Sequence, residues 1–407
     1  MERKKWDLVG LASIPLVMTL GNSMLIPVLP MIEKEIGITP FQSGLIISVY
    51  SFIAILLIPL AGYLSDRIGR KKVIIPSLII AGVGGVVSAF AAWKLDNPYL
   101  FILVGRFLQG IGASGAFPIV IPTVGDMYKD EKDVSAGLGF IETSNTFGKV
   151  LSPIIGAFLA YYIWFIPFAA IPILCIISII LVMVLVKAPA SKEDKKDYNF
   201  SSFRKSIKDV FHHNGRWLIS VFIIGCINML VLFALLFHFS FLLDDQYNVD
   251  GVLLKGVYLA IPLLFLCMTS YIAGKKVGEN KVMMKWAIII GNGLTAVSLL
   301  FFSSNLNLAF VLIVLTLVGI GIGLSLPCLD ALITEGVNKE VRGTVTSLYS
   351  SMRFLGVAFG PPLVSVLLKN FPGYLNICFV GFSLLAVLVT LFYVKPKHDI
   401  QLMGNRI

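Results

Sequence analysis

The hydrophobic pattern of this sequence consists of long apolar runs separated by short polar segments. Each run is near 20 residues or longer, enough for a helix to cross the roughly 30 Å hydrocarbon core of a bilayer. A membrane-spanning strand would be only about 10 residues long and would alternate in polarity, whereas these runs are apolar on every face. The pattern predicts an all-α membrane protein with twelve transmembrane helices, approximately at 8–32, 42–65, 73–93, 99–127, 135–161, 163–187, 217–243, 251–274, 282–304, 307–336, 342–368 and 373–394.

One long polar stretch, residues 187–216, interrupts the series and leaves six spans on either side. We therefore predict an N-terminal six-helix bundle at 1–187, a cytoplasmic linker at 188–216 and a C-terminal six-helix bundle at 217–407.

The two halves also resemble each other in sequence. A shift of 209 residues places the Gly-Ile-Gly sequence at 110–112 on the same sequence at 319–321. After one gap, Gly148 and Pro153 fall on Gly356 and Pro361. An even number of spans in each half makes the repeat parallel, which is typical of a transporter with two pseudo-symmetric bundles around a central site.

The composition supports a membrane protein. The chain has 407 residues, of which 57% are hydrophobic and only 14% are charged, compared with about 25% charged residues in a soluble domain. So little charge does not cover a water-facing surface of this size, which argues against a soluble globular protein. The net charge of +10 could indicate nucleic-acid binding, but its distribution argues otherwise.

The basic residues follow the positive-inside rule. With the N-terminus inside, the inward segments hold about 26 of the 33 Lys and Arg residues, and the outward loops hold about four, namely Lys34, Lys94, Lys255 and Lys369. We therefore predict a multi-pass protein of a bacterial-type cytoplasmic membrane with both termini cytoplasmic. Membrane lipids are expected partners and nucleic acid is not.

The loop after the second span carries a recognisable motif, Gly62-Tyr-Leu-Ser-Asp66-Arg67-Ile-Gly69-Arg70-Lys-Lys. It resembles the signature loop of the major facilitator superfamily, G-x-L-x-D-R-x-G-R-K, at the position that loop occupies. The resemblance implies a gating loop that latches the two bundles in the outward-open state. Asp126, at the inner end of the fourth span, is a candidate partner for Arg67 or Arg70. The alternative is a positive-inside loop without a gating role. In the second half, Lys275 replaces Asp66, so a latch is not expected there.

The fourth span contains Arg106-Phe-Leu-Gln109-Gly-Ile-Gly, which is similar to the span-four motif of the same family. A charged side chain within a bilayer span normally faces the bundle interior or a partner. In the family this arginine is linked to proton coupling. Arg106 lies only about seven residues into its span, so snorkelling to the outer interface is the alternative.

The fifth span resembles the antiporter motif of drug–proton exchangers, G-x-x-x-G-P-x-x-G-G, through Gly148, Ser152, Pro153 and Gly156. Ser152 and Ala157 stand at glycine positions of that motif. The eleventh span carries a matching set, Gly356, Gly360 and Pro361. Prolines allow bending and small residues allow close helix packing, so the motif favours export, although ordinary membrane-helix packing uses the same residues. The first span, with Asn22 and the sequence Ile-Pro-Val-Leu-Pro, resembles the twelve-helix drug:proton antiporter branch.

Proton coupling requires a carboxylate whose protonation changes with its surroundings. Glu142 and Asp330 lie within spans, and Arg106, Lys149 and Arg353 are the intramembrane cations. We expect Glu142 or Asp330 to carry the proton and the three cations to tune it. Static charge-satisfying pairs are the alternative.

Substrate-cavity candidates share a polar or aromatic character within spans. Glu142, Asn145 and Lys149 lie on one helical face because their spacings are three and four. On the seventh span, aromatic residues recur every four residues and could stack on flat or cationic substrates, although lipid contact or helix packing is the favoured explanation. The cavity candidates are Asn22, Gln109, Asn145, Phe233, Phe237, His238 and Phe241.

The sequence contains no P-loop, nucleotide fingerprint, metal-ligand cluster or catalytic triad. We therefore expect a transporter rather than an enzyme, without cofactor or metal, driven by a proton gradient. The favoured function is a proton-coupled multidrug exporter of small amphipathic compounds that works by alternating access as a functional monomer. A dedicated exporter of one metabolite, sugar or lipid-linked cargo is the alternative, and a non-transporting membrane sensor with the same fold is a third.

Overall fold

A computed structural model describes residues 2–128, 131–187, 200–277, 280–303, 306–337 and 339–394 of the chain. Within these residues the structure is almost entirely helical and contains no strand. The elements are α1 (Glu2–Ser23), η1 (Ile26–Val28), α2 (Leu29–Ile36), α3 (Pro40–Ile68), α4 (Arg70–Lys94), α5 (Tyr99–Met127), α6 (Glu131–Tyr162), α7 (Ile166–Leu185), α8 (Phe200–Asp245), α9 (Val252–Val277), α10 (Lys281–Leu300), α11 (Leu308–Gly336), α12 (Lys339–Asn370), η3 (Pro372–Tyr374) and α13 (Leu375–Tyr393).

These elements provide twelve long helices among the described residues, as predicted, because α2 is a short continuation of the first span. Eleven segments are long and apolar enough to cross a membrane. The twelfth, α6, is absent from that set, and it is the helix that carries Glu142 and Lys149 in its middle. A span with charged groups in its interior needs protein around them, so α6 is a candidate for a functional helix.

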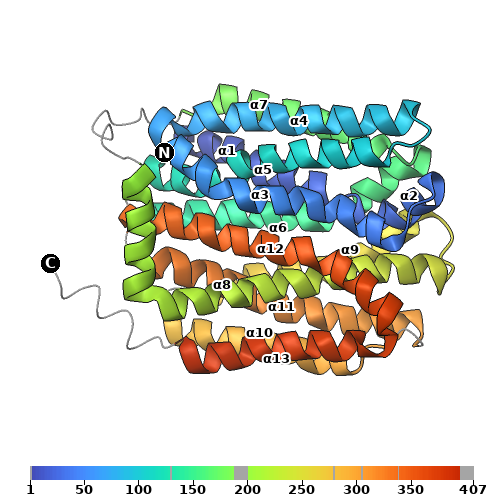
Figure 1. The fold of residues 1–407 in the computed structure, drawn as a ribbon. Coiled ribbons are helices and arrows are strands. Elements are labelled where there is room, and N and C mark those ends of the chain that lie inside the picture. Colours follow the sequence, from blue (N-terminus) through green and yellow to red (C-terminus); the bar gives the residue numbers. More distant parts are fainter. Residues whose placement is uncertain are drawn as a thin grey trace. The chain divides into compact units, whose positions relative to one another are not determined.

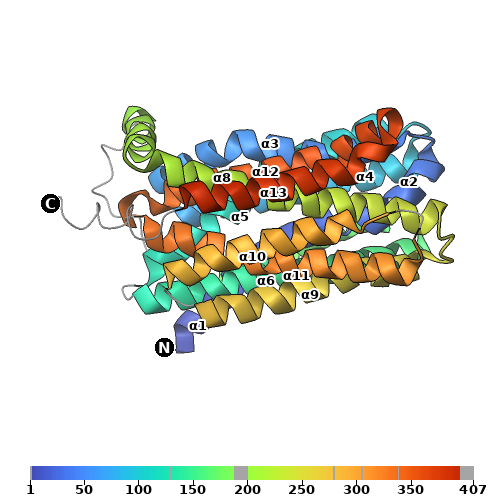
Figure 2. The same ribbon diagram turned by 90° about the horizontal axis from the view of Figure 1, so that it is seen from below.

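The helices form two compact units. Unit 1 contains Met1–Tyr198 and Leu236–Ala260, and unit 2 contains Asn199–Leu235 and Ile261–Ile407. Within each unit the long helices run alongside one another (Figures 1 and 2). The closest neighbours in unit 1 include α4 with α5 and α1 with α6, and those in unit 2 include α10 with α11 and α10 with α13. The predicted linker at 188–216 includes residues 188–199, which lie outside the described residues, so the predicted domain boundaries stay a prediction.

The same glycines mediate helix packing in both halves. In each half the first glycine of the Gly-Ile-Gly sequence faces the second long helix, and the last glycine faces the third. A Cβ atom on any of the four would overlap a backbone carbonyl oxygen of the neighbouring helix. The close pairs are Gly110 with Tyr50, Gly112 with Ser77, Gly319 with Pro262 and Gly321 with Gly291. The sequence repeat therefore reflects a structural repeat, in which small residues let helices approach closely.

Two predicted spans differ in extent from the observed helices. The first, predicted as one helix at 8–32, is interrupted after Ser23 by a turn and η1. Pro27 and Pro30 explain the interruption, because neither has an N–H to donate to a continuing helix. The seventh span, predicted at 217–243, begins 17 residues earlier, at Phe200, in the polar stretch. The first turns of α8 bend sharply away from its remainder (Figure 1).

Several spans present one apolar face to the surroundings. On α7 the exposed residues include Ile173, Ile176, Ile180 and Val184, with exposed fractions between 54% and 70%. Their spacing of three and four places them on one helical face. In water such a face would be unfavourable, whereas in a bilayer it contacts acyl chains.

Candidate functional site

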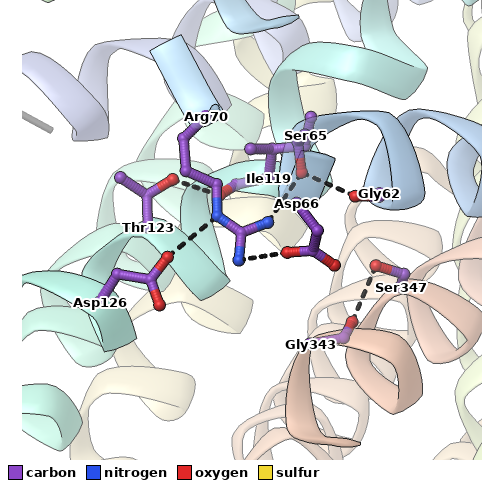
Figure 3. A network of polar contacts seen from close by, with 9 residues as sticks. All are labelled: Gly62, Ser65, Asp66, Arg70, Ile119, Thr123, Asp126, Gly343 and Ser347. Carbon is purple, nitrogen blue, oxygen red and sulfur yellow. Dashed lines mark hydrogen bonds and ion pairs between the residues drawn. The ribbon is translucent and has the colours of Figure 1, made fainter. Parts of the chain in front are cut away.

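Arg70, at the start of α4, is the centre of the loop network between α3 and α5 (Figure 3). Its Nη2 atom lies 2.6 Å from Asp66 Oδ1, and its Nε atom donates to Asp126 Oδ2 at 3.0 Å. Its Nη1 atom donates to Ser65 Oγ at 2.7 Å. Arg70 therefore uses all three of its nitrogens and ties the end of α3 to the end of α5. Of the two partners considered for Asp126, the structure shows Arg70.

The other motif residues shape this turn. Ser65 Oγ donates to the carbonyl oxygen of Gly62 at 2.8 Å. Gly69 has φ +105°, a conformation that residues with a Cβ rarely adopt, and it lets α4 start directly after α3 ends. Arg67 is exposed, and no ion pair is found for it among the described residues. In the second half, Lys275 is described, but the residues of the corresponding turn at 278–279 lie outside the described residues.

Arg106 is fully buried in unit 1, which excludes snorkelling to an interface. Its Nε atom donates to the carbonyl oxygen of Ile46 at 2.7 Å. Its Nη1 atom donates to Gln109 Oε1 at 2.5 Å and to the carbonyl oxygen of Gly21 at 3.3 Å, and its Nη2 atom donates to Asn22 Oδ1. The guanidinium also lies over the ring of Tyr50, with Cζ 4.7 Å from the ring centroid.

Residues that the sequence assigned to separate roles thus meet at this buried arginine. Asn22 and Gln109 were predicted to line a substrate cavity, and Arg106 was predicted to tune a proton carrier. Asn22 and Gln109 are 5% and 2% exposed. Together with Arg106 they form one polar cluster in the core of unit 1, at the end of α1.

Helix α6 carries a second polar chain. Asn145 Nδ2 donates to both carboxylate oxygens of Glu142, at 3.1 and 3.2 Å. Asn145 Oδ1 accepts from Thr19 Oγ1 of α1 at 2.6 Å. Lys149, one turn further along α6, is only 6% exposed. On the predicted face, Asn145 and Lys149 are therefore buried inside the protein rather than against lipid, and Glu142 is half-buried.

The antiporter-motif residues pack α6 against α1 and α12 against α8. A Cβ atom on Gly156 would overlap the backbone of Met24, in the turn directly after α1, and one on Gly356 would overlap the carbonyl oxygen of Cys226 on α8. Gly148 faces Leu16 and Thr19 of α1, and Gly360 faces Leu230 and Ala234 of α8. Ser152 Oγ donates to the carbonyl oxygen of Gly148 at 2.6 Å. The two halves therefore use the same pairing, between their first and fifth helices, with Pro153 and Pro361 inside the fifth helices.

Unit 2 contains one ion pair within its spans among the described residues. Arg353 Nη1 of α12 lies 3.2 Å from Asp330 Oδ1 of α11, and both side chains are mostly buried. The guanidinium also lies 5.6 Å from the ring centroid of Tyr349, one turn earlier. The proximity expected for Asp330 and Arg353 is present, whereas their role in proton coupling stays a prediction.

Two of the three phenylalanines in the aromatic stripe of α8 are buried rather than lipid-facing. Phe233 and Phe237 are 5% and 2% exposed, and His238 is 5% exposed. The rings of Phe237 and Phe241 lie 4.9 Å apart. Lipid contact therefore does not explain Phe233 and Phe237, and helix packing or substrate contact remain.

Sequence reasoning missed a cluster in unit 1 where α8 ends. Asp244 forms ion pairs with Lys34 of α2 and Lys255 of α9. Nearby, Ser240 Oγ donates to the carbonyl oxygen of Ile26 at 2.8 Å. Asp244 follows an apolar run directly, so the sequence pattern resembled the start of an ordinary outer loop. Among the described residues no group of three His, Cys, Asp or Glu side chains could hold a metal ion.

Comparisons with known proteins agree with this architecture. The sequence matches the profile of the Major Facilitator Superfamily over residues 11–361 and again over 280–402. A solved structure of the human organic anion transporter MFSD10 (TETRAN) superposes with a TM-score of 0.74, covering 95% of this chain and 99% of that chain. Its sequence identity is only 17%, so it supports the fold alone.

Several characterised relatives align over almost the full chain. The bacillibactin exporter of Bacillus subtilis is 53% identical over 394 residues, which cover 97% of both chains. Multidrug resistance protein 2 of Bacillus subtilis is 25% identical and covers 98% of this chain and 97% of its own length. The class E tetracycline resistance protein of Escherichia coli is 26% identical, with coverage of 94% and 95%. Family and relatives are transporters rather than enzymes.

Proposed function

We propose a function from one premise: this chain belongs to the major facilitator superfamily, and it is a multi-pass transporter that exports a small molecule. The finer proposal is that it exports bacillibactin or a closely similar metabolite. The observation that carries this proposal is the 53% identity to the bacillibactin exporter over 97% of both chains. The two resistance proteins are only 25–26% identical over comparable lengths.

This proposal changes the order of the functions expected from the sequence. There, multidrug efflux ranked first and a dedicated metabolite exporter second. The antiporter motif and the aromatic stripe do not distinguish the two, because both kinds of exporter need bendable helices and a lined cavity. The identity to a relative named for one compound favours the dedicated exporter, and multidrug efflux is the second candidate.

Reconstitution of the purified protein in proteoliposomes tests the substrate. We expect saturable transport of bacillibactin and little transport of tetracycline or cationic dyes. Comparable transport of many unrelated cationic compounds, without bacillibactin transport, would support multidrug efflux instead. Binding of bacillibactin without any flux would support a membrane sensor with a transporter fold.

For the energy source we propose exchange against protons, with Glu142 or Asp330 as the proton carrier. The support is the placement of these carboxylates within spans, one beside Asn145 and the other beside Arg353. With an imposed pH gradient, we expect Glu142→Gln or Asp330→Asn to lose gradient-driven accumulation but to retain downhill flux. If both variants keep full gradient-driven export, neither carboxylate carries the proton. We also propose that both termini are cytoplasmic and that the protein functions as a monomer.

A further inference from the structure

The polar cluster around Arg106 holds a buried positive charge beside neutral groups only. The four acceptors of its guanidinium are the carbonyl oxygens of Ile46 and Gly21 and the amide oxygens of Asn22 and Gln109. Among the described residues, no carboxylate forms an ion pair with Arg106. A buried charge is normally paired with an opposite charge, so this cluster departs from the usual arrangement.

The cluster also contains more hydrogen-bond donors than acceptors. A guanidinium has five N–H donors, and four hydrogen bonds are found for Arg106. Gln109 turns its oxygen towards Arg106, and its Nε2 atom is buried and has no hydrogen-bond partner among the described residues. Unpaired buried donors are unfavourable, and a group that supplies only acceptors would satisfy them.

The position of the cluster in the fold is also typical of a binding site. Gly21 and Asn22 lie in the last turn of α1, which ends at Ser23, before the turn that leads to η1. Interrupted membrane helices frequently line the substrate sites of secondary transporters. The end of α1 presents carbonyl oxygens, which repel an anion, so the attraction for an anion comes from Arg106 and the amide of Gln109. The carbonyl oxygen of Gly21 accepts a hydrogen bond from Arg106. The Nε2 atom of Gln109, which has no hydrogen-bond partner among the described residues, belongs to the same cluster.

We propose that the Arg106–Gln109–Asn22 cluster is a binding subsite for an anionic oxygen group of the cargo, such as a carboxylate. The anion would compensate the charge of Arg106 and accept from the Nε2 atom of Gln109. The cluster is buried in this structure, so a conformational change is needed for an anion to reach it. The identity of the cargo in this inference rests on the proposed export function, whereas the chemistry of the site does not.

Two alternative explanations of the cluster make different predictions. A buried water molecule would accept hydrogen bonds but would leave the positive charge uncompensated. A purely structural role, in which Arg106 caps the carbonyl end of α1, requires no ligand. Neither would make the protein respond to an anion in preference to its neutral isostere.

The test uses benzoate and its neutral isostere benzamide as probes of the purified full-length protein, with thermal stability as the readout. Gln109→Glu and Asn22→Asp each place a carboxylate next to Arg106 without changing side-chain size. Gln42→Glu is the matched control, because it makes the same change in the capping box of α3, where glutamate serves as well as glutamine. Bacillibactin flux in proteoliposomes is the second readout.

We expect benzoate, but not benzamide, to raise the melting temperature of the unmodified protein and of Gln42→Glu. Gln109→Glu and Asn22→Asp should fold, lose the benzoate response and transport bacillibactin about tenfold more slowly, because an internal carboxylate occupies the subsite. An equal response to the two probes, no response to benzoate, or a retained response in both carboxylate variants would overturn the proposal. A benzoate response without bacillibactin flux in the unmodified protein would refute the proposed cargo and uphold the anion site.

Discussion

At the scale of single residues, the burial of a charged side chain in this protein depends on the partners that it contacts. Arg70 contacts two carboxylates and a hydroxyl, whereas Arg67, three residues earlier in the same motif, is exposed. The sequence predicted both arginines as gating residues and left the partner of Asp126 open. Spacing along the chain does not determine which side of a turn an arginine faces, so only the folded structure distinguishes them.

The geometry of Arg70 predicts that lysine does not replace it. Lysine is a single point charge and does not bind two carboxylates through a planar fork. We expect Arg70→Lys to reduce the transport rate about tenfold, through loss of at least one charge-assisted hydrogen bond worth roughly 1.5–3 kcal/mol. Arg67→Lys is the matched variant and should have a smaller effect. Initial rates in proteoliposomes measure the difference, and equal rates for the two variants would contradict the assignment.

At the scale of elements, the sequence predicted the number and approximate positions of the helices correctly, because apolar length is a strong signal. It failed where local chemistry changes a helix. Two prolines interrupt the first span, and α8 continues into the polar stretch before it. The Asp244 cluster was missed for a related reason, since contacts between distant segments leave no local pattern in the sequence.

The packing of α6 against α1 predicts a clear difference between two glycines of α6. Gly156 has no room for a Cβ atom beside Met24, whereas Gly139 has no neighbouring atom within 4 Å. We expect Gly156→Ala to destabilise the protein by about 1–3 kcal/mol through overpacking. Gly139→Ala should be neutral or slightly stabilising, because alanine favours the helix. Thermal unfolding in detergent measures both, and equal melting temperatures would show that α6 does not pack closely on α1.

Asp244 and Asp245 form a second matched pair at the end of α8. Asp244 is paired with Lys34 and Lys255, whereas no ion pair is found for Asp245 among the described residues. Asp244→Asn leaves two lysines near each other without their shared carboxylate, so we expect it to lower the melting temperature by several degrees. Asp245→Asn should change it less. High salt should reduce the difference, because Lys34 is largely exposed.

At the scale of the whole molecule, two related sets of six helices are built with the same close contacts. The Gly-Ile-Gly pairs and the first-to-fifth helix packing recur in both units. The basic side chains predicted within the spans, Arg106, Lys149 and Arg353, are buried or mostly buried rather than in contact with lipid. This arrangement is the physical basis of the proposed transport, because a carrier needs polar groups that are shielded from the bilayer.

The central claim, that the chain is a carrier for one metabolite, is tested most directly by counterflow. Proteoliposomes containing the purified protein are loaded with unlabelled bacillibactin and diluted into trace labelled bacillibactin, with no ATP and no ion gradient. A carrier that alternates its access exchanges one molecule for the other, so labelled compound should accumulate transiently above its outside concentration. Failure to accumulate label, in vesicles whose protein is folded and binds bacillibactin, would contradict the account.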